Sequence, residues 1–241
     1  MGILRDIYNK TFSKNGVDNM SNLDVIKEIR VNHLDQYSSW ALYDIDDARL
    51  KEYLDQDNKI PNENLAFPAK YQNDEALANK INTDAMFYGL NVAARNIKTD
   101  SGDWANFHDT RDKSKDLGIL FDLYNTKFRG AYMSDVFKDL PETESKNVKV
   151  SQLVKDMQAD GDNDAKKSLR LLQKEIDIIK PKIIVLYGAP SQDAFDKMIK
   201  ANLLTLPEGV KIVGRHHYSM GERYDEKATK LVKESKEIYG E

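Results

Sequence analysis

The chain of 241 residues contains no cysteine. This absence excludes disulfide bonds, iron–sulfur clusters held by thiolates, and catalytic thiols. Long apolar runs are also missing: none approaches the roughly 18 residues that a membrane-spanning helix needs, and the first residues lack the apolar centre of a signal peptide. We therefore expect a soluble protein of the cytoplasm with no membrane partner, and we expect it to be a monomer.

Several familiar catalytic signatures are absent. The sequence lacks the glycine-rich phosphate loops of nucleotide-binding proteins, the Gly-x-Ser-x-Gly turn of serine hydrolases and the His-Glu-x-x-His helix of zinc proteases. Only four histidines are present, and the adjacent pair His216 and His217 cannot both face one metal ion from an extended segment. The acidic segment 160–164 lacks the glycine and the closing glutamate of a calcium loop, so we interpret it as a helix cap. We expect no metal and no cofactor.

Charge of either sign is nearly balanced. The chain holds 36 basic and 40 acidic residues, which gives a formal net charge of -4. Proteins that bind nucleic acid through a broad electrostatic field carry a large excess of basic residues. A nucleic-acid surface on this chain must therefore be a local patch.

Four apolar runs are present, and each is followed by polar or small residues. These runs are 86–91, 131–135, 183–189 and 210–219. Such runs are typical of buried parallel strands, and ligands bind outside the carboxyl ends of parallel strands. The pattern therefore predicts that Asn91, Asp135 and His217 converge at one edge of a sheet.

Apolar residues with helical spacing occur before, between and after the four runs, and this arrangement predicts the fold class. We expect a three-layer α/β/α fold with a short, mainly parallel central sheet and an N-terminal helical extension. The chain is predicted to form a single domain, with residues 1–72 as a helical lead-in and loop and residues 73–241 as the α/β core. Helices are expected at 74–82, 117–124, 164–180, 191–201 and 222–238. The polar segment 93–115 is too long for an ordinary connection and is a candidate functional loop.

The order and spacing of short motifs over residues 84–224 resemble the uracil-DNA glycosylase superfamily. The segment 89–93, Gly-Leu-Asn-Val-Ala, resembles the Gly-Leu-Asn-Pro-Gly loop whose Asn positions the attacking water, which implies that role for Asn91. The segment 104–107 resembles the stretch that places an aromatic ring against a flipped base, which implies stacking by Phe107. The strand 131–138 is similar to the one that ends in a base-reading Asn, and here that position is Asp135.

The resemblance continues towards the C-terminus. The segment 181–189 resembles the third strand of the superfamily, and 217–219, His-Tyr-Ser, stands in the place of its His-Pro-Ser loop, whose His stabilises the departing base. The resemblance thus implies that His217 is catalytic and that Leu90 and Ser219 belong to the base site. Met220 is a candidate wedge into the base stack, and Arg215 and Arg223 are candidates for phosphate contacts.

Physical chemistry independently favours a base site. Cleavage of an N-glycosidic bond leaves positive charge on the sugar and negative charge on the base, so it requires an aimed donor and a placed water. His217 and Asn91 are suitable for these two tasks, and Phe107 and Asp135 are suitable for holding a flipped base.

Two other functions stay open at this point. Val92, Ala93, Asp135 and Tyr218 depart from the superfamily pattern, which is what a non-catalytic nucleic-acid or nucleotide binding module would show. The modest net charge keeps a small-molecule nucleoside hydrolase open as a third function. We expect a DNA glycosylase-like hydrolase with DNA, single- or double-stranded, as the partner.

Overall fold

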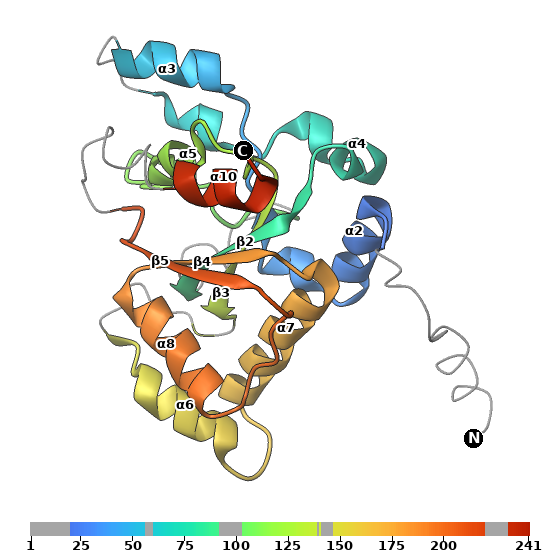
Figure 1. The fold of residues 1–241 in the computed structure, drawn as a ribbon, viewed down its shortest axis with the longest axis vertical. Helices are drawn as coiled ribbons and strands as arrows, with labels where there is room; N and C mark the ends of the chain where they lie inside the picture. Colours follow the sequence, from blue (N-terminus) through green and yellow to red (C-terminus); the bar gives the residue numbers. More distant parts are fainter. Residues whose placement is uncertain (1–19, 56–59, 92–102, 139, 141–146, 220–230) are drawn as a thin grey trace, which may run out of the picture.

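The computed structural model describes residues 20–55, 60–91, 103–138, 140, 147–219 and 231–241 (Figure 1). Within these residues a five-stranded sheet lies between two layers of helices. The helices are α2 (Asn22–Val31), α3 (Asp47–Asp55), α4 (Asp74–Ala78), α5 (Leu117–Leu123), α6 (Val150–Gln158), α7 (Asp164–Ile179), α8 (Ala189–Lys200) and α10 (Val232–Tyr239), with short 3-10 turns at Leu34–Gln36, Asn62–Leu65 and Ala69–Tyr71. The strands are β1 (Ser39–Trp40), β2 (Asn82–Asn91), β3 (Ala131–Phe137), β4 (Ile183–Tyr187) and β5 (Lys211–Arg215).

The sheet is mainly parallel, as the sequence predicts. The strand order is β1-β3-β2-β4-β5, and every neighbouring pair is parallel except β1 with β3. Because β2, β3, β4 and β5 run in the same direction, their carboxyl ends lie at one edge of the sheet. The four predicted strands are thereby confirmed.

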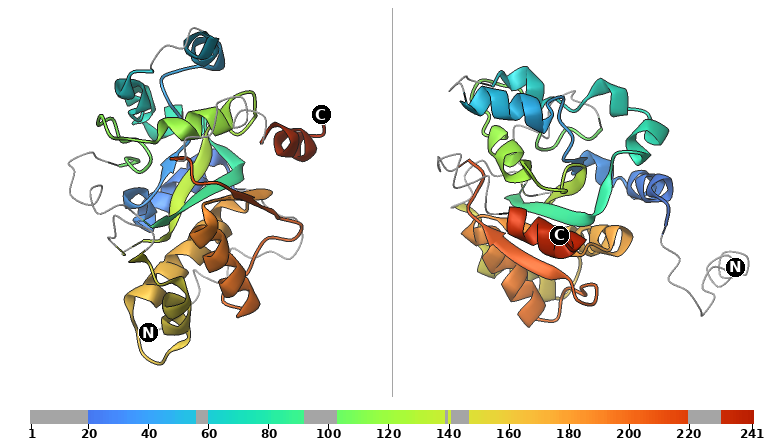
Figure 2. Two further views of the ribbon diagram at one scale, coloured as in Figure 1. Left: turned by 90° about the vertical axis from the view of Figure 1, so that its left-hand side faces the viewer. Right: turned by 45° about the horizontal axis from the view of Figure 1, so that its top comes forward.

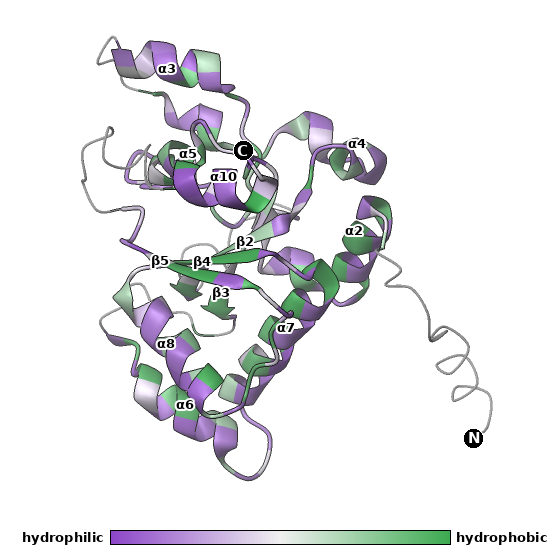
Figure 3. Ribbon diagram, in the orientation of Figure 1, coloured by the Kyte–Doolittle hydropathy of each residue, from purple (hydrophilic) through white to green (hydrophobic). Residues whose placement is uncertain are grey.

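Helices cover both faces of the sheet. In Figure 1, α6, α7 and α8 lie below the sheet, and α3, α5 and α10 lie above it; the views in Figure 2 show the same separation. One apolar cluster fills the side of α7 and α8, and a second fills the side of α5. Figure 3 shows that α7 has one hydrophobic and one hydrophilic face. This is the amphipathic pattern from which the helix was predicted.

A side-chain cap marks the start of α7, whereas α8 begins without one. The side chain of Asn163 accepts a hydrogen bond from the backbone N–H of Lys166, so the acidic segment 160–164 ends in a helix cap, as predicted. Ser191, in contrast, does not cap α8, which starts after Gly188, and its hydroxyl donates to the carbonyl of Tyr187. Gly188 has φ of +83°, a conformation that costs a glycine little.

The N-terminal region is more than a helical lead-in. Within residues 20–72, β1 pairs with β3 and thus forms part of the sheet, and α2 buries Val25, Ile26 and Ile29 in the cluster of the α7 side. β1 could not be predicted, because a two-residue strand is too short to show an alternating pattern. The predicted boundary at residue 72 therefore does not separate two packing units.

The last predicted helix is described only in part. Residues 220–230 lie outside the described residues, and α10 occupies Val232–Tyr239. In the parts of the chain that the structure describes, no helix is both long and apolar enough to cross a lipid bilayer.

Candidate functional site

Gly89 on β2 lies opposite Asp135 on β3, near the carboxyl ends of both strands. A methyl group at position 89 would overlap Oδ1 of Asp135 and would lie 3.4 Å from the ring of Phe107. The missing side chain of Gly89 is thus what allows a carboxyl group and an aromatic ring to meet over this strand. Two residues that the sequence predicts to share a site, Phe107 and Asp135, are brought together here.

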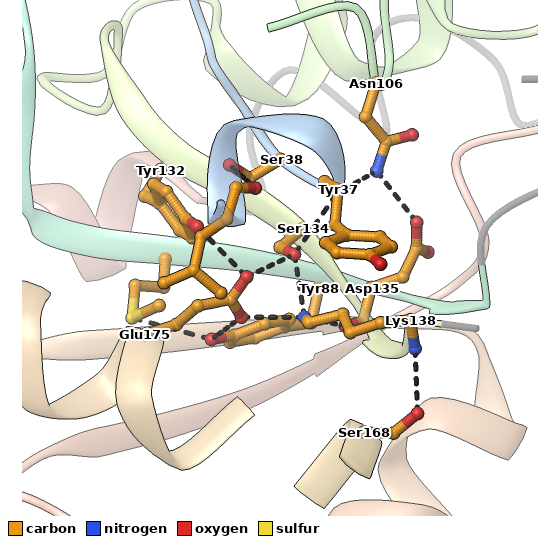
Figure 4. A network of polar contacts seen from close by, with 12 residues as sticks. Tyr37, Ser38, Tyr88, Asn106, Tyr132, Ser134, Asp135, Lys138, Ser168 and Glu175 are labelled. Carbon is orange, nitrogen blue, oxygen red and sulfur yellow. Dashed lines mark hydrogen bonds and ion pairs between the residues drawn. The ribbon is translucent and has the colours of Figure 1, made fainter. Parts of the chain in front are cut away.

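The carboxyl group of Asp135 is almost completely buried, with 4% of the residue exposed. The amide nitrogen of Asn106 donates a hydrogen bond to its Oδ2 at 2.9 Å (Figure 4). Burial raises the pKa of Asp135 from 3.8 to about 6; the Asn106 bond and the charge of Lys138 oppose this rise, and the charges of Glu175 and Asp116 add to it. Asp135 therefore titrates near neutral pH.

A buried polar network lies beside Asp135 on β3. The Lys138 ammonium group donates to the backbone carbonyl of Asp135 and to Ser134 Oγ, and it forms an ion pair with Glu175 on α7 (Figure 4). The Glu175 carboxylate accepts hydrogen bonds from Tyr88 at 3.1 Å, Tyr132 at 3.0 Å, Ser134 at 2.8 Å and Lys138 at 2.7 Å. Because all four donors are inside the protein, the network ties the end of β3 to α7.

The loop that carries Phe107 is held in an unusual backbone conformation. Phe107 has φ of +64° and Trp104 has φ of +63°, and residues with side chains seldom adopt such values. Each strained residue is anchored through its carbonyl oxygen: Tyr43 donates to Phe107 at 3.1 Å, and Ser39 donates to Trp104 at 2.7 Å. Strain that is held in place in this way is typical of functional sites.

His108, next in this loop, lies between two carbonyl oxygens. Its Nδ1 is 2.7 Å from the carbonyl oxygen of Leu65, and its Nε2 is 3.2 Å from that of Trp40. A neutral imidazole can donate to only one of them. Burial lowers the pKa of His108 from 6.5 to about 4, so the ring is neutral at pH 7. We assign the proton to Nδ1, which makes the shorter contact.

His217 follows β5 and lies against the start of α8. A methyl group built on Gly188 would be 3.6 Å from the imidazole Cδ2. The backbone N–H of Ser219 donates to Nδ1 of His217 at 3.2 Å. Because this nitrogen accepts a hydrogen bond, the neutral ring carries its proton on Nε2. The hydroxyl of Ser219, a residue predicted to belong to the base site, lies 2.7 Å from Nδ1 of His217.

Tyr218 connects His217 with Phe107. Its ring stacks on the imidazole of His217 at a centroid distance of 4.3 Å and meets the ring of Phe107 edge-on at 6.0 Å. A second edge-on contact, at 5.2 Å, joins Tyr218 to Tyr187 at the end of β4. The His217 side of the edge and the Phe107–Asp135 side are therefore parts of one contiguous cluster.

Asn91 lies at the same edge, two residues beyond Gly89 on β2. Its backbone pairs with Phe137, and its amide nitrogen donates to the carbonyl of Leu140 at 3.2 Å. This bond fixes the orientation of the amide group. Asn91 and His217 are thus at one edge of the sheet, as predicted, and strand β4 lies between the strands that carry them.

Two predicted site residues have different surroundings. Leu90 points to the opposite face of the sheet, where it is 5% exposed and packs in the α7-side cluster, because neighbouring residues of a strand alternate faces. Arg215 is 7% exposed and forms an ion pair with Asp122 on α5. We therefore withdraw the base contact of Leu90 and the phosphate contact of Arg215. Met220 and Arg223 lie outside the described residues.

Asn106 and Glu175 are residues of the site that none of the sequence motifs indicates. Glu175 did leave a signal, because it occupies a position on the apolar face of α7 between Leu172 and Ile176, where a charged side chain requires a buried partner. Asn106 left no such signal in the sequence, because an asparagine in a loop is ordinarily a turn residue. No group of three or more potential metal ligands is present in the described ranges.

Comparison of the chain with known protein families finds no match, and neither do comparisons with curated proteins and with solved structures. A function for the chain must therefore be inferred from the chemistry of this edge.

Proposed function

We propose that the chain is a DNA glycosylase-like hydrolase that cleaves the N-glycosidic bond of a damaged or mispaired base. One observation carries the proposal: an aromatic ring, a carboxyl group and an imidazole, from Phe107, Asp135 and His217, form one cluster at the carboxyl edge of a parallel sheet. In open parallel sheets this edge is where ligands bind.

The cluster offers the contacts that a flipped base requires. A base that leaves the helical stack loses a few kcal/mol, which stacking and edge hydrogen bonds must offset. Phe107 supplies an aromatic ring at the site, and Asp135 supplies a hydrogen-bonding group. Both are supported by surrounding contacts rather than by a loose surface, so little side-chain freedom is lost when a base binds.

The reaction itself is a hydrolysis. The bond between the sugar C1′ and the base nitrogen breaks, and its electron pair leaves with the base; the oxygen of a water molecule bonds to C1′, and the proton released by this water returns to the base. His217, with its proton on Nε2, is the donor that stabilises the anionic base. Asn91, with its amide held by Leu140, is the residue that positions the water.

Asp135 suggests which bases are accepted. An ionised carboxylate only accepts hydrogen bonds, whereas the edge of uracil presents one donor between two carbonyl acceptors. A guanine-type edge has adjacent N1–H and N2–H donors that a carboxylate can accept. We therefore propose a donor-rich base as the substrate at pH 7, with uracil accepted as Asp135 becomes protonated near its pKa of about 6.

A non-catalytic binding module is the second candidate. One observation favours it: the Asn91 amide donates to the backbone of Leu140, a contact that a purely structural asparagine would also make. Such a module would use Phe107 and Asp135 in the same way and would lack turnover.

A strand-scission assay separates the two functions. The protein is incubated with a panel of oligonucleotides, each carrying one damaged or mispaired base, and abasic sites are cleaved with alkali. Scission by the wild-type chain that is lost in His217→Ala supports the hydrolase. Salt-dependent binding without scission of any oligonucleotide supports the binding module, because phosphate contacts release counterions whether or not the bond is cleaved. Hydrolysis of free nucleosides without binding to DNA contradicts both.

A further inference from the structure

Asn106 uses its amide nitrogen twice. The nitrogen donates to the backbone carbonyl of Tyr37 at 2.8 Å and to Oδ2 of Asp135 at 2.9 Å. An amide nitrogen carries two hydrogens, so these two bonds use both. Asn106 is itself buried, with 8% exposed, and the polar atom that it retains is its carbonyl oxygen.

The two oxygens of Asp135 are therefore not equivalent. Oδ2 receives the hydrogen bond from Asn106, whereas Oδ1 adjoins Gly89 and, among the described residues, receives no hydrogen bond. Figure 4 shows the carbonyl oxygen of Asn106 turned away from the carboxyl group of Asp135. What the pair retains for a ligand is one carboxylate oxygen and one amide oxygen, and both are acceptors.

We propose that Asn106 is a positioning residue that fixes Asp135 with Oδ1 towards the base site. The pair then presents only hydrogen-bond acceptors to a ligand and recognises base edges that are rich in donors. This inference rests on the proposed function for its ligand. The superfamily asparagine that Asp135 replaces would donate as well as accept. In this chain Asn106 cannot replace that donor, because Tyr37 and Asp135 occupy both of its hydrogens.

The groups that change the pKa of the Asp135 carboxyl come from several elements. Asn106 is on the loop before α5 and Asp116 is next to that helix; Lys138 follows β3, and Glu175 is on α7. Of these, Asn106 makes the direct hydrogen bond to the carboxylate, and its effect can be removed without changing a charge. A neutral substitution at position 106 therefore isolates the positioning effect from the electrostatic effects of the other three.

The first test is independent of any ligand. Carbon-13 NMR follows the titration of the Asp135 carboxyl group in the full chain, and the signal is assigned by its loss in Asp135→Asn. We expect Asn106→Leu to raise the midpoint by about one to two pH units, because a hydrogen bond to a charged group contributes about 1.5–3 kcal/mol and 1.36 kcal/mol corresponds to one unit. Asn106→Ser, whose shorter hydroxyl group does not reach both partners, is expected to raise it as well and serves if the leucine variant does not fold.

The matched control is Asn32→Leu. Asn32 also donates its amide to a backbone carbonyl, that of Glu28 at 2.7 Å, but it has no contact with Asp135. We expect the Asp135 midpoint to be unchanged in this variant. An unchanged midpoint in a folded Asn106→Leu or Asn106→Ser variant would overturn the positioning role.

The second test asks whether Asp135 and Asn106 together recognise a base edge that is rich in donors. Binding is measured at pH 8 to two polyadenine oligonucleotides that differ in one central residue, guanine or uracil. We expect the wild-type chain to prefer guanine and Asn106→Leu to lose about tenfold of that preference, because the carboxyl group that contacts the base is no longer held in position. A wild-type preference for uracil would overturn the inference that the pair presents only acceptors to the base. If neither oligonucleotide binds, the proposed function and its base reader both fail, while the NMR titration still decides whether Asn106 positions Asp135.

Discussion

Lys138 and Glu175 form an ion pair at 2.7 Å in which neither side chain has any exposure to solvent. The pair joins the end of β3 to the middle of α7. Buried charges are costly unless hydrogen bonds satisfy them, and here Ser134, Tyr88 and Tyr132 supply further bonds. Since Lys138 also binds the backbone carbonyl of Asp135, the same pair supports the strand end at which the candidate site lies.

Removal of one partner should therefore destabilise the fold strongly. We expect Lys138→Met to lower the free energy of unfolding by about 3–5 kcal/mol, because it leaves the Glu175 carboxylate buried without a counter-charge. Urea unfolding at pH 7 measures the loss. The double variant Lys138→Met with Glu175→Gln should recover part of it, since no unpaired charge is left. If the loss of unfolding free energy in the double variant equals the sum of the losses in the two single variants, the two residues do not act as a pair.

Gly89→Ala tests the close approach of β2 to Asp135. The new methyl group would overlap Oδ1 of Asp135, whose carboxyl group is held by Asn106 and cannot move freely. We expect a loss of stability of about 1–3 kcal/mol from overpacking, together with loss of base binding. The control is Gly214→Ala on β5, where the methyl group would meet the side chain of Gln192, whose amide nitrogen donates to the carbonyl of Arg215 at 2.9 Å. If Gly89→Ala and Gly214→Ala affect base binding equally, Gly89 is not part of the site.

Asp135 should make the fold less stable as pH rises. Its pKa in the folded state is about 6 against an ordinary value of 3.8, so between these values the folded state binds more protons than the unfolded state. Stability contributed by protonated Asp135 is therefore complete below about pH 4 and is lost as pH rises through 6; the loss is about 3 kcal/mol. Asp135→Asn should gain stability relative to wild type over this range, as measured by urea unfolding at several pH values.

His108 should act in the opposite direction over an overlapping range. Burial lowers its pKa to about 4 from 6.5, so the unfolded state binds more protons here and stability rises with pH until about 6.5. The contributions of Asp135 and His108 should consequently offset each other between pH 4 and 6. We expect His108→Gln to become less stable as pH rises in this range, the reverse of Asp135→Asn. If the stability of both variants changes in the same direction as pH rises, then Asp135 and His108 do not have opposite effects.

His217→Ala tests catalysis directly. A group that stabilises charge developing on the leaving base contributes mainly in the transition state. We therefore expect base release to slow by about 100- to 1000-fold with little change in affinity for DNA. The exposed neighbour His216→Ala is the control and should retain the wild-type rate. If affinity falls as much as the rate in His217→Ala, the residue positions the substrate instead.

The parallel strands and the edge that they share could be predicted from the sequence because long apolar runs and polar strand ends are local patterns. Asn91, Asp135 and His217 were placed at that edge for the same reason, whereas Phe107 was assigned to the site through the resemblance of segment 104–107 to a base-stacking stretch. Leu90 was misassigned because proximity in sequence was taken as proximity in space, although neighbouring strand residues face opposite sides. Asn106 and β1 were missed because their partners, Asp135 and β3, are distant in the chain, and no local pattern records such pairings.

The antiparallel pairing of β1 with β3 has a consequence for the order in which the protein forms on the ribosome. Ser39 and Trp40 are synthesised long before Met133 and Tyr132, their partners on β3. During synthesis, β1 has no strand to join, and the apolar face of α2 has no α7 to pack against. The N-terminal part therefore remains unassembled until the centre of the chain has emerged. Such delayed, long-range pairing slows folding and prolongs the exposure of apolar segments to other nascent chains.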